Sequence, residues 1–362
     1  MRVLVAMSGG VDSSVAAALL VEQGHDVIGV TLKQWEGPSG EMPTAGCCTV
    51  GDAEDARRVA AQLDVPYYVL DYVDRFRHAV VDPFAEAYAR GETPNPCIEC
   101  NRTVRFSALL DRTEALGCDL LATGHHARAE RIGGRWALRT AADPDKDQSY
   151  VLHMLGQGEL ARIRFPVGHL TKHQVREKAA ELGLRTAAKP DSQDLCFIGK
   201  GDYRRFLRGE RPELARPGPI VDEDGRRVGE HGGTIDFTIG QRRGIGVAAA
   251  DGPRYVTGID PATATVRIGR RHDLAAASCD VADATFVSGA PPVSGEAPVE
   301  VEVKVRYRAR AAPGTIARHG DGWRAVFATP QLGVAPGQAA VFYRGDEVLG
   351  GGRIAATHRP AT

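Results

Sequence analysis

A glycine- and serine-rich loop near the start of the chain has the composition of a phosphate-binding loop. It reads Ser-Gly-Gly-Val-Asp-Ser-Ser over residues 8–14 and joins the apolar run 3–6 to the apolar segment 15–20. Its glycines allow the backbone to turn tightly beside an anion, while its serine hydroxyls and the N–H groups of a following helix would point toward that anion. Asp12 would suit the Mg²⁺ that accompanies nucleotide phosphates. The loop therefore predicts a nucleotide site.

The same loop lacks the lysine that ends a Walker loop. No Gly-Lys-Ser or Gly-Lys-Thr run occurs in the chain, so a kinase or GTPase of that type is not expected. The pattern Ser-Gly-Gly-x-Asp-Ser instead resembles the PP-loop of the ATP pyrophosphatases, and this resemblance implies adenylation of a carbonyl or carboxyl oxygen with release of pyrophosphate. A plain helix-capping turn is the simpler interpretation, but strand, loop and helix follow in the order that an α/β phosphate site requires.

Two cysteines in a proline-stiffened segment could supply sulfur chemistry. Cys97 and Cys100 lie in Thr-Pro-Asn-Pro-Cys-Ile-Glu-Cys-Asn, residues 93–101, ahead of a helix expected to begin near residue 102 or 103. A thiol just before a helix N-terminus is favoured as the thiolate by the helix dipole, and Arg102 and Arg105 add positive charge. Cys100 is therefore the candidate nucleophile.

A third cysteine, Cys196, lies in Asp-Leu-Cys-Phe-Ile-Gly, residues 194–199. Any of these cysteines alone could be an incidental buried thiol, and the Cys-x-x-Cys pair could equally mark zinc. Combined with an ATP loop, the three cysteines are more informative than any one of them alone. An alternative stays open, in which Cys97, Cys100 and Cys196 hold three irons of a 4Fe-4S cluster.

Composition sets broad limits on the function. The 362 residues are 43% hydrophobic with a net charge of −1, which suits a large enzyme and excludes a generally basic protein, so a nucleic-acid partner must meet a local patch. The chain opens directly on an expected strand and has no apolar stretch of roughly 18 residues, so we expect a cytoplasmic protein without a membrane span. Adjacent Cys47 and Cys48 fall in an expected surface loop.

The elements that must position these residues follow an α/β pattern up to about residue 206. Short apolar runs alternate with helical segments, which predicts a parallel sheet with ligands at the carboxyl ends of its strands. Beyond Pro217, short alternating segments with glycine turns predict small β modules. The expected strands are 2–7, 26–32, 67–70, 120–122, 299–306, 323–328 and 339–343, and the expected helices are 52–63 and 103–116.

Seven stretches together resemble the tRNA-specific 2-thiouridylase family, PP-loop enzymes that thiolate the wobble uridine of bacterial tRNA. They span nearly the whole chain in order: 8–14, 93–106, 122–125, 146–150, 194–199, 240–244 and 305–308. The resemblance implies an α/β fold, with a parallel-sheet PP-loop catalytic domain of the adenine nucleotide alpha hydrolase type over 1–206. A small central β domain over 207–275 and a tRNA-contacting C-terminal β-barrel over 276–362 would follow.

The resemblance also implies roles for individual residues. Cys100 would be the nucleophile and Cys196 the persulfide carrier. The residues that would hold ATP are Ala6, Met7, Ser8, Gly9, Gly10, Val11, Asp12, Ser13, Leu32 and Gly124. Those that would contact tRNA are Asn95, Pro96, Cys97, His125, Lys146, Asp147, Gln148, Arg306, Tyr307 and Gln338.

The implied reaction has a chemical logic. The C2 carbonyl of uracil is a poor electrophile, so attaching AMP to its oxygen creates a leaving group. A persulfide on Cys196 can then deliver sulfur, leaving Cys100 and Cys196 as a disulfide. The implied cofactors are ATP and Mg²⁺, with the 4Fe-4S cluster as the alternative. The implied partners of a monomeric enzyme are the Lys, Glu and Gln tRNAs and a cysteine desulfurase or sulfur-relay protein.

The run Arg306-Tyr307-Arg308-Ala309-Arg310 is a candidate RNA contact. Its alternation predicts that the three arginines share one strand face and grip phosphates, although such a run can also be an ordinary solvated face. Two other functions stay open. One is a PP-loop synthetase acting on a small molecule, which needs no paired thiols. The other is an ATP-dependent sulfur carrier or cluster scaffold that binds RNA without modifying it.

Overall fold

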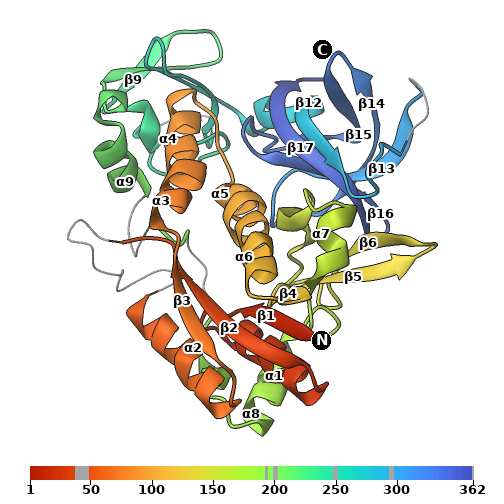
Figure 1. The fold of residues 1–362 in the computed structure, drawn as a ribbon. Helices are drawn as coiled ribbons and strands as arrows, with labels where there is room; N and C mark the ends of the chain where they lie inside the picture. The colour runs from red at the N-terminus through yellow and green to blue at the C-terminus, as the bar shows by residue number, and fades with distance from the viewer. Residues whose placement is uncertain (37–48, 192–194, 199–202, 248–251, 293–296, 361–362) are drawn as a thin grey trace.

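The structure is a computed structural model that describes residues 1–36, 49–191, 195–198, 203–247, 252–292 and 297–360. Cys47 and Cys48 lie outside the described residues. Figure 1 shows an α/β part that carries the N-terminus, a small part around α9 and β9, and a β-barrel at the C-terminal end. No described helix is long and apolar enough to cross a membrane.

A parallel sheet organises the first part of the chain. In the described residues its strand order is β3 (Tyr67–Asp71), β2 (Asp26–Lys33), β1 (Arg2–Ala6), β4 (Leu120–Thr123) and β7 (Ile163–Arg164). Alternate side chains of β1 enter two different apolar clusters, Val3 and Val5 on one face and Leu4 on the other. Both faces are therefore covered, and the predicted α/β class is confirmed.

Helices on the two faces come from different parts of the sequence. One face packs against α1 (Val11–Glu22), α2 (Val50–Gln62) and α8 (Lys172–Glu181). The other packs against two long helices, each with a π-helical middle. The first runs through α3 (Val73–Phe76), π-helical Arg77–Val81 and α4 (Asp82–Ala89), and the second through α5 (Pro96–Glu99), π-helical Cys100–Ala108 and α6 (Leu109–Ala115).

The helix that carries the first two candidate cysteines begins earlier than predicted. It starts at Pro96 rather than near residue 102, because the Asn95 side chain accepts a hydrogen bond from Cys97 N at 3.1 Å and caps the helix. Proline at the first helical position reinforces this start, since its missing N–H would have no helical partner there. Cys100 therefore lies one turn inside the helix, and the prediction that it precedes the N-terminus is wrong.

Two β domains follow. The central one, after α9 (Tyr203–Glu210), has β10 (Tyr255–Asp260), β11 (Thr265–Gly269), β8 (Gly218–Val221) and β9 (Arg227–His231) in that order. The last is a closed barrel in which the described strands are β12 (Ala275–Phe286), β15 (Gly322–Leu332), β14 (Ala312–His319), β13 (Val299–Lys304), β16 (Ala339–Arg344) and β17 (Glu347–His358), and β17 pairs back with β12. Helix α9 crosses the proposed boundary at 206, so those domain limits stay a proposal.

A hairpin from the first domain joins the barrel. It consists of β5 (Ala127–Ile132) and β6 (Arg135–Thr140), which the sequence pattern did not predict, and β6 pairs with β17 through Leu138 and Val348. The remaining described helical turns are Ser149–Leu152, α7 (Gln157–Arg162), Arg185–Ala188, Pro212–Leu214, Thr234–Asp236 and Arg271–Leu274. The hairpin makes the barrel sheet continuous with strands of the first domain.

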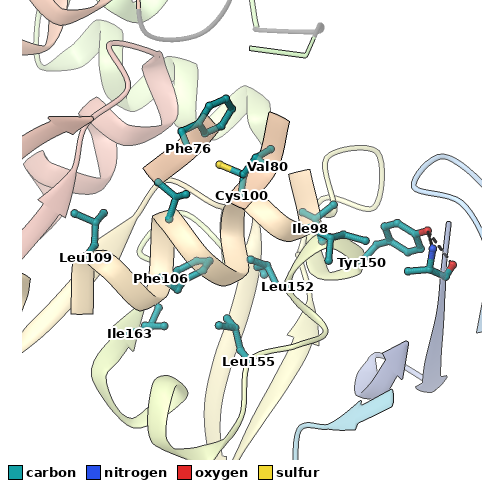
Figure 2. Close-up of a cluster of buried hydrophobic side chains, with 14 of the residues drawn as sticks. Phe76, Val80, Ile98, Cys100, Phe106, Leu109, Tyr150, Leu152, Leu155 and Ile163 are labelled. Carbon is teal, nitrogen blue, oxygen red and sulfur yellow. Dashed lines mark hydrogen bonds between the residues drawn. The ribbon is translucent and has the colours of Figure 1, made fainter. Parts of the chain in front are cut away.

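Side chains reinforce this junction. The Tyr150 hydroxyl donates to the Ala339 carbonyl at 2.9 Å and lies 3.3 Å from Ala339 N, as the dashed lines in Figure 2 mark. Ser149 Oγ lies 3.2 Å from the Tyr343 hydroxyl, and both residues are buried. These contacts hold barrel strand β16 on the turn that follows residue 148.

We expect Tyr150→Phe to destabilise the protein by about 1–3 kcal/mol, because it leaves the buried Ala339 carbonyl without its donor. Urea unfolding followed by fluorescence measures the change. Tyr68→Phe, at a largely exposed tyrosine, is the matched control and should alter stability by less than about 0.5 kcal/mol. Equal stability of the two variants would contradict this account of the junction.

Candidate active site

The predicted phosphate loop lies at the carboxyl end of β1. Met7 N donates to Val30 O at 2.7 Å, and the chain then turns through Gly9, whose φ of 71° lies in the left-handed region. Helix α1 begins directly afterwards with Gly10 at its N-cap, a residue that has no side chain to cap the helix. The N–H groups of the first turn are therefore left for a ligand, and an anion is the ligand they favour.

Two of the loop serines do not face the ligand as predicted. Ser13 Oγ and Ser14 Oγ both donate to the Gly10 carbonyl, at 3.1 and 2.9 Å, and both side chains are buried. Ser13 Oγ also accepts from Ser8 N at 3.1 Å. These hydroxyls brace the loop from behind, while the backbone amides and the exposed Ser8 remain at its surface.

Two glycines let other elements press against the loop. A Cβ on Gly124, just after β4, would lie 2.5 Å from Ser13 N. A Cβ on Gly9 would overlap the Asp52 carbonyl at the start of α2. No other residue fits at either position without moving the loop, so Gly124 and Gly9 set its shape by their lack of a side chain.

A buried lysine connects the loop to the segment that leads toward the third cysteine. Lys172 Nζ lies 2.7 Å from a carboxylate oxygen of Asp12 and 2.7 Å from one of Asp191, and its side chain is only 11% exposed. His126 Nε2 lies 3.0 Å from Asp12 Oδ1. Burial opposes the charge on Asp12, but the hydrogen bonds from His126 and Lys172 outweigh it and lower the pKa of this carboxyl. A Mg²⁺ ion at Asp12 would compete with both partners.

The Asp191 carboxylate forms ion pairs with three cationic side chains. Besides Lys172, it accepts from Lys146 Nζ at 2.8 Å and from Arg176 at 3.1 Å. Burial opposes its ionisation, but the hydrogen bonds from Lys146 and Lys172 prevail and lower the pKa of Asp191 to about 2. On the other side of the loop, Lys189 Nζ donates to Gly9 O at 2.9 Å.

Sequence reasoning missed Lys172, Asp191 and Lys189. One signal was available for Lys172, which begins α8 directly after the N-cap residue Thr171. A cation is disfavoured at a helix N-terminus, so a lysine there indicates an anionic partner from elsewhere in the fold. The carboxylates that pair with Lys172, Asp12 and Asp191, are distant from it in sequence, so no local pattern predicts these ion pairs.

The first two cysteines differ in their surroundings. Cys97 is exposed in the first turn of its helix, whereas Cys100 is 6% exposed within the main apolar cluster. Figure 2 shows Cys100 beside Phe76 and Val80. Gln34, the residue directly after β2, donates from Nε2 to Cys100 Sγ at 3.4 Å. The sulfur of Cys100 therefore lies at the same carboxyl edge of the sheet as the loop.

Cys196 packs against the cluster that contains Cys100. The next residue, Phe197, is buried among aromatic rings, with centroids 5.7 Å from Phe76 and 5.2 Å from Phe206. In the described part of the chain no disulfide joins the two cysteines, so the expected bond is not a feature of this structure. Among the described residues no group of three His, Cys, Asp or Glu side chains could hold a single metal ion. The alternative of a 4Fe-4S cluster on the three cysteines stays a prediction.

Several residues expected to contact tRNA have partners within the protein. The His125 imidazole is buried beside Phe106 and Phe165, and burial together with nearby Arg105 lowers its pKa to about 3. The Asp147 carboxylate accepts hydrogen bonds from Ser149 N at 3.1 Å and from Ser149 Oγ at 2.9 Å. Gln148 Oε1 accepts a hydrogen bond from His126 N at 2.8 Å. Gln338 Nε2 donates to the Thr93 carbonyl at 2.7 Å. A direct contact of these side chains with RNA stays a prediction.

The basic run after β13 is a turn, so the prediction that its arginines share a strand face is wrong. Strand β13 ends at Lys304, and Ala309 N donates to Arg306 O at 3.1 Å. The Arg306 guanidinium donates to Ile239 O of the central domain at 3.3 Å, which turns this residue inward. Tyr307 and Arg308 are exposed. Tyr307 lies close to Tyr150, with ring centroids 6.3 Å apart, and partial burial together with nearby Asp147 and Cys97 raises the pKa of its hydroxyl.

A parallel-sheet domain with this loop, followed by two β domains, defines the class: an HUP-type α/β domain with two appended β domains, the last of them a closed barrel. Three family models match the chain in order, described as the tRNA methyl transferase HUP domain over residues 1–200, the tRNA methyl transferase PRC-barrel domain over 204–270 and the aminomethyltransferase beta-barrel domain over 276–354. They match the three-part organisation observed here.

Curated relatives give the family. The chain is 51% identical to the tRNA-specific 2-thiouridylase MnmA of Chloroflexus aurantiacus, over 98% of each chain. It is 50% identical to that of Roseiflexus sp. strain RS-1, over 98% of this chain and 99% of the relative, and 49% identical to that of Sorangium cellulosum, over 99% and 93%. The chain belongs to the tRNA-specific 2-thiouridylase family.

We expect Gly124→Ala to weaken ATP binding by about tenfold or more, because the new methyl group would displace Ser13 N and with it the first turn of α1. Calorimetric titration with ATP measures the affinity. Gly158→Ala, at a helical glycine with open space around it, is the control and should bind ATP normally. Unchanged ATP affinity in Gly124→Ala would contradict the assignment of this loop.

The lowered pKa of Asp191 predicts a pH-dependent contribution to stability. Its folded pKa of about 2 lies below the usual value of 3.8, so its ion pairs stabilise the folded state above about pH 4 and are lost as the pH falls toward 2. Asp191→Asn should therefore be less stable than the parent at neutral pH, and the difference should shrink between pH 4 and 2. Urea unfolding across this range tests the prediction, and a constant difference would contradict it.

Proposed function

We propose that the protein thiolates the wobble uridine of tRNA at C2, using ATP and a cysteine persulfide. One observation carries the proposal. The hydrogen bond from Gln34 to Cys100 Sγ places the Cys100 thiol at the carboxyl edge of the sheet. The uncapped N-terminus of α1, whose N–H groups favour an anion, lies at the same edge. Membership of the thiouridylase family supports tRNA as the substrate.

Adenylation is the first step of the proposed reaction. The N–H groups of the first turn of α1 would bind the phosphates, and the C2 oxygen of the uridine would attack the α-phosphorus as pyrophosphate leaves. The loop itself, from Ala6 to Ser13, and the neighbours Leu32 and Gly124 would surround the nucleotide. Mg²⁺ would arrive with ATP and neutralise phosphate charge.

Sulfur transfer is the second step. The terminal sulfur of a persulfide on Cys196 would attack C2, forming a C–S bond as the C–O bond to AMP breaks. The Cys100 thiolate would then attack Cys196 Sγ, which forms the Cys100–Cys196 disulfide and leaves the sulfur on C2. A thiol reductant would return both cysteines to the reduced state. The alternative order releases hydrosulfide through Cys100 before the attack on C2.

The proposed tRNA surface spans the first domain and the barrel. Asn95, Pro96 and Cys97 at the start of the Cys100 helix would flank the target base, and the barrel residues Arg306, Tyr307 and Gln338 would contact the RNA from the other side. His125 and residues 146–148 complete the proposed set. We further propose that the enzyme works as a cytoplasmic monomer on the Lys, Glu and Gln tRNAs, with sulfur from a cysteine desulfurase or a sulfur-relay protein.

The direct test of function is nucleoside mass spectrometry on unmodified tRNA-Lys incubated with the protein, Mg-ATP, a cysteine desulfurase and cysteine. We expect 2-thiouridine with the parent protein and none with Cys196→Ser, because the serine variant cannot carry sulfane sulfur. Cys118→Ser, at a buried cysteine elsewhere in the first domain, should remain active. ATP turnover without thiouridine would direct the assignment to a small-molecule PP-loop synthetase instead.

Loss of an exposed arginine should weaken tRNA binding through a phosphate contact. We expect Arg308→Gln to lower affinity at every tRNA sequence and to reduce the slope of log K against log salt by about 1, since one fewer counterion is released. Filter binding at several salt concentrations measures the slope. Arg57→Gln, on the far helix α2, is the control. An unchanged slope in Arg308→Gln would remove this residue from the RNA surface.

A further inference from the structure

The end of β2 and the two residues after it, 32–35 in all, reach three parts of the site. Leu32 lies in β2 at the edge proposed to hold ATP. Gln34 donates to Cys100 Sγ at 3.4 Å. The Trp35 ring packs on Phe197, the residue after the third cysteine, with centroids 6.3 Å apart. Residues 32–35 thus connect the proposed ATP edge of the sheet with Cys100 and with the segment that carries Cys196.

Gln34 is an unusual residue for its position. Gln34 is 2% exposed and its amide lies beside Cys100, which is 6% exposed and belongs to a cluster of mainly apolar residues. Burying an amide is costly unless its groups are hydrogen-bonded, so a glutamine is not a neutral choice there. One of its N–H groups is directed at the sulfur atom that the proposed reaction uses.

The surroundings of Cys100 create a need for such a donor. Burial among side chains such as Phe76 and Val80 favours the neutral thiol over the thiolate (Figure 2). The start of the helix favours a thiolate at Cys97, in its first turn, more than at Cys100, one turn further along. An N–H directed at sulfur binds the anion more strongly than the neutral thiol, which opposes the effect of burial.

We propose that Gln34 is a positioning residue for the thiolation reaction, whose side-chain amide holds the buried Cys100 sulfur as a thiolate at the carboxyl edge of β2. The need for a nucleophilic sulfur rests on the proposed function, whereas the hydrogen bond does not. Gln34 thereby sets the reactivity of Cys100 without touching the substrate.

The test is peptide-resolved alkylation of the full-length protein with iodoacetamide between pH 6 and 10, followed by mass spectrometry. Cys97 and Cys100 lie between Arg90 and Arg102 on one tryptic peptide, and fragmentation distinguishes them. In Gln34→Leu we expect the pH midpoint of Cys100 alkylation to rise and its rate at pH 7 to fall about tenfold. The Cys97 profile should not change.

Two further variants keep the result interpretable. Gln34→Glu retains the shape of the side chain but replaces the donor with a carboxylate, so Cys100 should again be alkylated more slowly at pH 7, and this variant decides the question if the leucine variant does not fold. Thr113→Val removes a different buried hydrogen bond, to Leu109 O, and should leave the Cys100 profile unchanged. An unshifted Cys100 midpoint in folded Gln34→Glu overturns the proposal.

A thiolation assay then separates this inference from the proposed function. We expect both Gln34 variants to make 2-thiouridine with a lower kcat and an unchanged affinity for ATP. A shifted alkylation midpoint in a parent protein that makes no thiouridine would contradict the proposed function and leave the hydrogen bond established. Thiouridine formation by a parent protein whose Cys100 midpoint does not shift in the Gln34 variants would support the proposed function and overturn the role of Gln34.

Discussion

The site depends on one buried cation, Lys172, held between two carboxylates from different parts of the chain. A buried charge is tolerated only where opposite charges surround it, so Asp12 in the phosphate loop and Asp191 ahead of the third cysteine must both stay close to its ammonium group. Because Asp191 also accepts from Lys146, the same network reaches the turn proposed to contact tRNA. The glycine-rich loop, the segment ahead of Cys196 and the turn that contains Lys146 are therefore linked by the ion pairs of Lys172 and Asp191.

The barrel imposes a second constraint from the opposite side. Thr93 N donates to Pro336 O at 2.8 Å and Gln338 Nε2 donates to Thr93 O at 2.7 Å, so the barrel fixes the segment that precedes the helix carrying Cys97 and Cys100. With the β5–β6 hairpin continuing the barrel sheet, the C-terminal domain fixes the position of the segment that leads into the Cys100 helix, while Asn95 and Pro96 set the residue at which this helix begins.

The local features of this fold were predictable from sequence, and the long-range ones were not. The loop at 8–14, the strands around it and the sheet edge follow from glycine content, apolar alternation and helix signals within a few residues. The ion pairs of Lys172 join residues up to 160 positions apart, and no periodicity reports such pairings. The early helix start was missed although Asn95 and Pro96 are a recognisable cap, and the turn at Arg306 was read as strand because its bond to Ile239 comes from another domain.

We propose that the loop activates the C2 oxygen of uridine by adenylation, so that sulfur replaces this oxygen as AMP departs. An anticodon stem-loop whose target uridine carries oxygen-18 at C2 distinguishes this route from others, through mass analysis of the nucleotide released during thiolation. We expect AMP that contains one oxygen-18 for each 2-thiouridine formed. Unlabelled AMP, or ADP and phosphate in its place, would contradict it.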